Sequence, residues 1–146
     1  MKRMLSLVGL SVGMLFLLIT LISSFLPRHV RVSRALDLPY KPAVVQAVLQ
    51  RESYWETVLP KGTSITVESQ TNRSIHFLVN NKSAIQMAAG YQLFSDRAES
   101  TCSVQRYYDF YFDWYPWEKF SSLLVESKFG SALENELQQL KKKLEQ

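Results

Sequence analysis

The sequence predicts an α+β protein in which one N-terminal transmembrane helix precedes an antiparallel sheet that curls around a long C-terminal helix. Three observations predict this architecture. No charged residue interrupts the chain from Met4 to Leu26, which is typical of a membrane-spanning helix. Residues 29–115 contain several segments in which polar and apolar residues alternate, as they do in β-strands. Apolar residues then recur at helical spacing after Pro116.

Length and composition favour one globular domain behind the apolar segment. The chain has 146 residues, of which 47% are hydrophobic and 12% aromatic, so it can bury one ordinary core. We divide it into an anchor, residues 1–27, and a domain, residues 28–146. The net charge of +4 is small and spread along the chain. Because no basic stripe with interleaved aromatic residues is present, we expect no nucleic-acid partner.

The N-terminal apolar run is expected to remain attached as a single-pass anchor. At about 1.5 Å per residue, Met4–Leu26 crosses a hydrocarbon core of roughly 30 Å. A cleaved signal peptide is the alternative, since it also begins with basic residues such as Lys2 and Arg3. However, the run exceeds the usual length of about 7–15 apolar residues, and no small-x-small site precedes Pro27. We therefore expect the lipid bilayer to be the partner of residues 4–26.

The flanking charges say little about the orientation of this anchor. Lys2 and Arg3 lie on one side, and Arg28, Arg31 and Arg34 lie on the other, so the positive-inside comparison is nearly balanced. The short basic tail favours an N-terminus in the cytoplasm and a domain outside it. A leucine-rich run after Met-Lys-Arg suggests a bacterial inner membrane.

The domain begins with an expected strand and two short helices. Residues alternate from His29 to Leu38, which predicts a strand. Pro42 suits the first turn of a helix, which we expect over Ala43–Arg51. A second short helix is expected over Ser53–Leu59, ending at Pro60.

A meander of four further strands is expected next. Their ranges are Thr63–Ser69, Ser74–Val79, Ser83–Phe94 and Thr101–Tyr115. The last has the clearest alternation, and Gly90 in the third allows a bulge or bend. One face of the last strand carries Cys102, Val104, Arg106, Tyr108, Phe110, Phe112 and Trp114.

The long C-terminal helix is expected to begin at Pro116 and to cover the sheet. Its apolar stripe consists of Trp117, Phe120, Leu124, Phe129, Leu133, Leu137, Leu140 and Leu144. The five-residue step from Leu124 to Phe129 places an expected bend near Gly130. Glutamates, Glu136 among them, are assigned with the lysines to the remaining surface. Apolar pockets form between a curved sheet and one covering helix, so a pocket is expected there.

Several local patterns support a resemblance to a known superfamily. They are Val30-Arg31-Val32-Ser33-Arg34-Ala35, Leu38-Pro39, Pro42, Val45 and Leu49, Trp55 with Leu59-Pro60, Trp117-Glu118-Lys119-Phe120, Phe129-Gly130, Leu133 and Leu137-Gln138-Gln139-Leu140-Lys141. In this order, the chain resembles the START-like helix-grip superfamily (SRPBCC), which includes polyketide cyclase/dehydrase and lipid-transport proteins. The resemblance implies a hydrophobic ligand between the sheet and the last helix. Only about four strands fit between Gly62 and Tyr115, whereas fuller members carry six, so a reduced pocket is expected.

The residues expected to line this pocket share the inner face of the sheet or the helix stripe. They are Arg106, Tyr108, Phe110, Tyr91, Met87, Phe77, Phe120 and Leu124. Arg106 stands out because an unpaired charge on an apolar face is costly. It could bind a carboxylate or phosphate of an amphipathic ligand, or it could reach water or a structural carboxylate. The aromatic residues could line the pocket or simply fill the core.

No pattern for a cofactor or for catalysis is found. His29 and His76 are far apart and have no nearby cysteine or paired carboxylates, so we expect no metal site. Cys102 is the only cysteine and cannot form an internal disulfide. Asp109 and Asp113 are expected on the solvated outer face. We therefore expect no cofactor and no catalytic residue.

Three functional interpretations remain open. The preferred one is a membrane-tethered module that binds a lipid or other hydrophobic small molecule without catalysis. The second is an interaction or scaffold protein at the membrane whose groove is filled by its own side chains. A cyclase-like enzyme is the third, and it would need an acid or base inside the pocket. An open cavity between sheet and helix would distinguish the first from the second.

Overall fold

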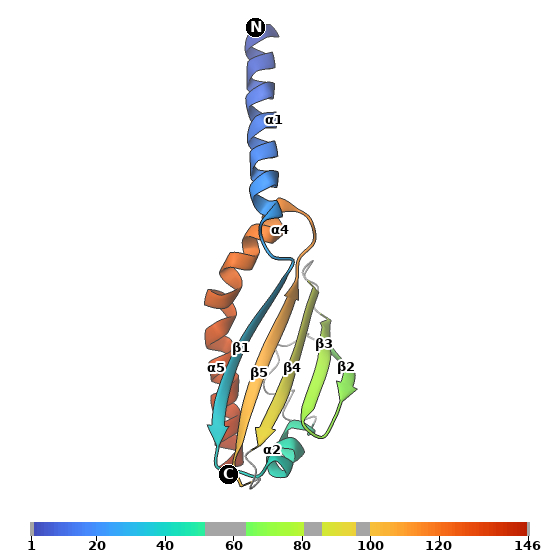
Figure 1. Ribbon diagram of the computed structural model, residues 1–146, viewed down its shortest axis with the longest axis vertical. Coiled ribbons are helices and arrows are strands. Elements are labelled where there is room, and N and C mark those ends of the chain that lie inside the picture. Colours follow the sequence, from blue (N-terminus) through green and yellow to red (C-terminus); the bar gives the residue numbers. More distant parts are fainter. Residues whose placement is uncertain (1, 52–63, 81–85, 96–99, 146) are drawn as a thin grey trace.

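A single apolar helix stands out from one end of an α+β domain in the computed structural model, which describes residues 2–51, 64–80, 86–95 and 100–145 (Figure 1). This helix, α1, covers Lys2–Ser24. Its segment Ser6–Ser24 has a mean hydropathy of 2.3 and is only 6% buried. A membrane anchor and a signal sequence both have these properties, so α1 is compatible with either role.

The sheet has five antiparallel strands in the order β1-β5-β4-β3-β2. Their bounds are β1 His29–Leu38, β2 Ser64–Gln70, β3 Ser74–Asn80, β4 Gln86–Ser95 and β5 Cys102–Tyr111. Strands β2 to β5 form the expected meander, and β1 pairs with β5 in the register Val32 to Tyr108. The first strand of the domain therefore joins the last one, as an edge of the sheet.

The helices after the sheet differ from the single long helix that the sequence predicted. Helix α4 covers Pro116–Ser121, a 3-10 turn η1 covers Ser122–Leu124, and α5 covers Val125–Leu144. The break lies at η1, ahead of the bend expected near Gly130. Helix α5 packs mainly on β1 and β5, and its residues Leu133, Leu137 and Leu140 are buried there. The predicted α+β class, with a sheet covered by the C-terminal helix, is confirmed.

Strand β5 ends four residues earlier than expected because the chain turns towards α4. The amide of Phe112 donates a hydrogen bond of 2.8 Å to the carbonyl oxygen of Arg28, which closes the end of the sheet. Trp114, Trp117 and Leu124, which were expected to face the core, are instead exposed.

The segment between β1 and the meander agrees with the sequence where it is described. Helix α2 covers Pro42–Leu49, with Pro42 in its first turn, and buries Val45 and Leu49. The helix expected over Ser53–Leu59 lies outside the described residues, as does the start of the strand expected from Ser83.

The outer face of the sheet holds a buried carboxylate that was expected to be solvated. Asp109 is 1% exposed. It accepts hydrogen bonds of 2.7 Å from both Nε and Nη2 of Arg31, and its Oδ1 lies 3.0 Å from Nε2 of His29. Burial acts to raise the pKa of Asp109, but the hydrogen bonds from Arg31 and His29 outweigh it and hold that pKa below its usual value. The expectation was wrong because β1 lies beside β5 and covers the carboxylate.

Candidate functional site

Arg106 occupies the middle of the inner face of the sheet, in contact with α5. The alternation of β5 places it on the same face as Tyr108, and the register sets it beside Tyr91 of β4. Its side chain is fully buried, and its Nε donates a hydrogen bond of 2.8 Å to Oε2 of Glu136. Because Glu136 belongs to α5, Arg106 faces the space between sheet and helix, as predicted.

The protein itself satisfies the charge of Arg106. Its Nη1 donates to the carbonyl oxygen of Gly90 at 3.2 Å, and its Nη2 donates to the hydroxyl of Tyr108 at 3.3 Å. The guanidinium carbon lies 4.5 Å from the ring centre of Tyr91 and 4.6 Å from that of Tyr108. Of the two roles weighed for Arg106, the structure shows pairing with a structural carboxylate.

Tyr108 and Glu136 complete a polar cluster with Arg106 in otherwise apolar surroundings. The Tyr108 hydroxyl donates a hydrogen bond to Oε1 of Glu136. Burial is the largest cause that raises the pKa of Tyr108 above its usual value, and Glu136 raises it further while Arg106 lowers it. Burial opposes the charge on Arg106, but its carboxylate and tyrosine neighbours outweigh that effect and raise its pKa. The cluster therefore holds one cation, one anion and a protonated phenol, and it has no net charge.

Glu136 is the residue of this cluster that sequence reasoning missed. It was assigned to the solvated surface of the last helix, yet it is only 8% exposed. Its spacing was the available signal, because Glu136 follows Leu133 by three residues and precedes Leu140 by four. Residues at those intervals share one face of a helix.

The structure brings together six of the eight expected pocket residues. Phe77 and Tyr91 are fully buried beside Arg106, while Tyr108 and Phe110 are nearly so and Met87 is half-buried on the same face. Phe129 of α5 packs on this face, with its ring centre 4.8 Å from that of Phe110. The other two lie elsewhere: Phe120 is half-buried in α4, and Leu124 is 65% exposed in η1.

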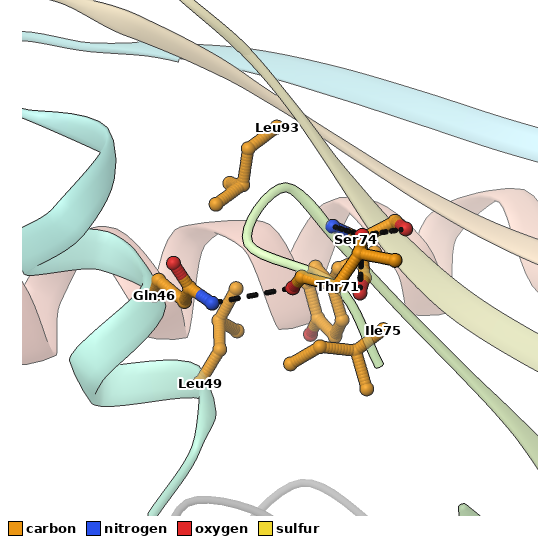
Figure 2. A pocket seen from close by; sticks show the side chains of 7 residues that line it. Gln46, Leu49, Thr71, Ser74, Ile75 and Leu93 are labelled. Carbon is orange, nitrogen blue, oxygen red and sulfur yellow. Dashed lines mark hydrogen bonds between the residues drawn. The ribbon is translucent and has the colours of Figure 1, made fainter. Parts of the chain in front are cut away.

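A small hollow adjoins this face where α2 meets β3 and β4 (Figure 2). It is lined by Gln46, Leu49, Thr71, Ser74, Ile75, Tyr91 and Leu93, and it leaves no room for even a water-sized molecule. Gln46 closes one side by donating a hydrogen bond of 3.2 Å from its Nε2 to the carbonyl oxygen of Thr71. Ligand pockets usually measure about 300–1,000 Å³, so this hollow alone is too small for a lipid. Tyr91 links it to the cluster around Arg106.

The described residues offer little for a metal. Within residues 2–51, 64–80, 86–95 and 100–145, no group of three or more His, Cys, Asp or Glu side chains is placed to hold an ion. Cys102 is buried at the start of β5, and burial raises the pKa of its thiol. Such a thiol is a poor metal ligand and a poor nucleophile.

Comparison with known proteins identifies the fold. No family model and no curated protein sequence matches the chain. Among solved structures, norcoclaurine synthase from Thalictrum flavum is 8% identical with a TM-score of 0.56, and the match covers 80% of this chain and 94% of that one. A Staphylococcus aureus protein of unknown function, SA2116, is 10% identical with a TM-score of 0.58, covering 80% and 94%.

A third similar structure is the di-domain aromatase/cyclase StfQ of the steffimycin biosynthetic pathway. It is 6% identical with a TM-score of 0.58, and the match covers 77% of this chain and 49% of that longer one. Identities this low carry information on the fold alone. Together with the sheet order and the covering helix, they show that the described residues beyond α1 adopt the helix-grip fold of the START-like (SRPBCC) proteins.

Proposed function

We propose that this protein is a membrane-tethered module that binds a lipid or another hydrophobic small molecule on the inner face of its sheet, without catalysis. The observation that carries the proposal is the cluster of Arg106, Tyr108 and Glu136 in the middle of an apolar face. Binding sites for small molecules are mostly apolar, with a few convergent polar groups that fix the orientation of the ligand. The cyclase and synthase among the similar structures have the same fold, and a hydrophobic ligand is compatible with it.

The charge balance of the cluster narrows the class of ligand. Because Glu136 already neutralises Arg106, an anionic headgroup would compete with that carboxylate in a poorly solvated place. A neutral headgroup with a hydroxyl or carbonyl would instead share hydrogen bonds with the cluster. We therefore expect a long-chain alcohol to bind at least as tightly as the corresponding fatty acid.

The absence of catalysis is part of the proposal. A general base needs a pKa near the working pH and access to a substrate proton. Glu136 is held by Arg106 and Tyr108, and the raised pKa of Tyr108 keeps its phenol protonated at neutral pH. Because both side chains already form hydrogen bonds within the cluster, we expect neither to act on a substrate.

The first test is native mass spectrometry of the full chain extracted from membranes in a mild detergent. The expected result is a co-purified hydrophobic molecule at about one per chain. Ala89 is fully buried on the inner face between Phe77 and Tyr108. Ala89→Leu should remove the ligand by filling its space, whereas Ala35→Leu, at an exposed position on the outer face of β1, should keep it.

The second test addresses the headgroup. Titration of a fatty acid and its alcohol against the unmutated protein should favour the alcohol or show no preference. Glu136→Gln keeps the shape of the side chain but leaves Arg106 as an uncompensated cation, so the preference should shift towards the acid by about tenfold, or 1.4 kcal/mol. An unchanged preference would mean that the ligand does not meet this cluster.

A scaffold protein with a filled groove is the second candidate function. The observation that favours it is the close packing around Arg106, next to a hollow with no room for even a water-sized molecule. In that case no ligand co-purifies, neither amphiphile binds, and Ala89→Leu lowers the stability of the domain by about 1–3 kcal/mol through overpacking.

A further inference from the structure

An exposed apolar surface lies at the end of the domain from which α1 emerges. It consists of Phe25, Trp114, Tyr115, Trp117, Leu123 and Leu124, which we call the collar. Phe25 is 86% exposed, Trp114 61% and Trp117 63%. Single exposed apolar residues are common, but several large ones gathered at one place on a small domain mark a surface that meets a partner.

The aromatic part of the collar is ordered by its own contacts. The rings of Trp114 and Tyr115 stack with centres 4.6 Å apart, and those of Tyr115 and Trp117 stack at 5.1 Å. Pro116, which lies between Tyr115 and Trp117 at the start of α4, is buried. Leu123 and Leu124 follow in η1, the next element of the chain, where they are 63% and 65% exposed. The three aromatic side chains are thus presented as one group.

The collar is fixed to the end of α1. Helix α4 packs against α1 (Figure 1). The buried Lys119 of α4 donates a hydrogen bond of 2.8 Å from its Nζ to the carbonyl oxygen of Leu26. Ser23, in the last turn of α1, is 2% exposed. The collar therefore has a fixed position along the axis of α1. The opposite end of the domain, with α2 and the C-terminus, lies far from it (Figure 1).

That position coincides with the surface of a bilayer crossed by α1. The apolar segment ends at Ser24, and at about 1.5 Å per residue it is as long as a hydrocarbon core is thick. Groups at the level of Phe25 and α4 would then lie among the headgroups. Tryptophan and tyrosine are enriched at this level because one part of each ring system is apolar and another forms hydrogen bonds. The exposed Arg28 adds a cation that suits anionic headgroups.

We propose that the collar inserts into the interfacial layer of the bilayer that α1 crosses, so that the domain stands on the membrane by its α4 end. This inference rests on the membrane tether of the proposed function, and it does not depend on a bound ligand. The collar therefore contacts lipid, and the sheet points away from the membrane with α2 and the C-terminus farthest from it (Figure 1).

The test uses tryptophan fluorescence of the full chain in vesicles of phosphatidylcholine and phosphatidylglycerol. Trp55 is changed to Phe in every protein, so that only Trp114 and Trp117 report. A matched reporter protein carries Trp114→Phe, Trp117→Phe and Phe94→Trp. Phe94 is 48% exposed and pairs with Ser103 near the start of β5, at the end of the sheet away from α4.

Lipids brominated near the headgroup end of their chains should quench the collar protein about twofold, and aqueous iodide should have little effect on it. The Phe94→Trp reporter should show the reverse. Circular dichroism of both proteins checks that they remain folded.

Two results would overturn the proposal while leaving the tether intact, provided that the chain still floats with the vesicles after an alkaline wash. One is collar fluorescence that iodide quenches and brominated lipid does not, and the other is protection from both quenchers, which would indicate that a second copy of the chain covers the collar. Loss of the chain from the vesicles in the alkaline wash would instead refute the tether, and the collar proposal with it.

Discussion

Arg106 and Glu136 form a buried pair whose two charges depend on one another. Taking a single charge out of water costs several kcal/mol, and a partner with well-placed hydrogen bonds offsets that cost. The alternation of β5 was sufficient to place Arg106 from the sequence. Glu136 was missed because a glutamate on an amphipathic helix is usually solvated, and only the position of α5 over β5 reveals that it meets Arg106.

The mutual dependence of this pair predicts a non-additive stability effect. Arg106→Met should lower the free energy of unfolding by about 3–5 kcal/mol, because it leaves Glu136 buried without its partner. Adding Glu136→Gln should restore at least half of that loss, since no lone charge then remains and the amide can still accept from Tyr108. Urea unfolding of the full chain in a mild detergent measures both. Additive losses would mean that the two side chains do not interact in solution.

Asp109 is a second residue whose burial the sequence alone does not reveal. Its partner Arg31 is 78 positions away in the chain, and only the register between β1 and β5 brings the two together. Polar alternation correctly puts Asp109 on the outer face, but it does not say what lies above that face.

The Asp109 cluster predicts a contribution to acid sensitivity. The pKa of Asp109 is lower in the folded protein than its usual value of about 4. Its stabilising contribution is therefore complete above about pH 4 and is lost as the pH falls from there through the folded pKa. Asp109→Asn should lower stability at neutral pH and flatten the decline in the free energy of unfolding below about pH 4. Asp113→Asn, at an exposed position, serves as the control and should leave the decline unchanged.

At the scale of elements, α5 is predicted well by its apolar stripe, whereas α4 and η1 are not. Residues Leu133 to Leu144 repeat at helical intervals and are buried or half-buried as expected. Trp117 and Leu124 continue the same spacing, yet they are exposed, because the turn at η1 changes the direction of the chain. A periodic pattern indicates which residues share one face of a helix. It does not indicate whether that face packs against the core of the domain or lies exposed on its surface.

The predicted apolar stripe has a buried part in α5 and an exposed part in η1. Truncating one leucine in each part should change the free energy of unfolding by different amounts. Leu137 is 3% exposed in α5, whereas Leu124 is 65% exposed in η1. Leu137→Ala should lower the free energy of unfolding by about 2–5 kcal/mol by opening a cavity. Leu124→Ala should change it by less than about 0.5 kcal/mol in detergent. Similar losses for both would mean that η1 packs into the core.

Two glycines in different elements should differ in how much the same substitution destabilises the domain. A Cβ at Gly90 in β4 would lie 2.6 Å from the backbone oxygen of Ile75 and would collide with the Tyr107 ring. A Cβ at Gly130 in α5 would meet only the end of the flexible Arg34 side chain, at 2.7 Å from Nη2.

Gly90→Ala is therefore expected to destabilise the domain by about 1–3 kcal/mol. Gly130→Ala should stay within about 1 kcal/mol of the unmutated protein, because the gain in helix propensity offsets the displacement of Arg34 from its exposed partners Glu126 and Glu134. Thermal or urea unfolding of the two variants side by side provides the measurement. A larger loss for Gly130→Ala would show that Arg34 holds α5 to the sheet more tightly than an exposed pair normally does.

At the scale of the whole molecule, the domain and α1 are joined by contacts that a cleaved leader would not need. Lys119 bonds to Leu26, and Ser23 is buried against the domain. We expect the mature protein to keep residues 1–27. N-terminal sequencing of protein purified from membranes should begin at or near Met1, and a start near Phe25 or Pro27 would refute this.

The pairing of β1 with β5 also has a consequence for how the domain folds. Strands β2 to β5 are neighbours in both sequence and space, so each hairpin closes only a short loop. His29 and Tyr111, in contrast, are opposite one another in β1 and β5. Pairing them closes a loop that contains most of the residues of the domain. Closing a longer loop loses more chain entropy, and non-local contacts form later. Strand β1 is synthesised before the other strands, yet it can pair only after β5 has formed. We therefore expect the docking of β1, together with α5, to be the slow step of folding.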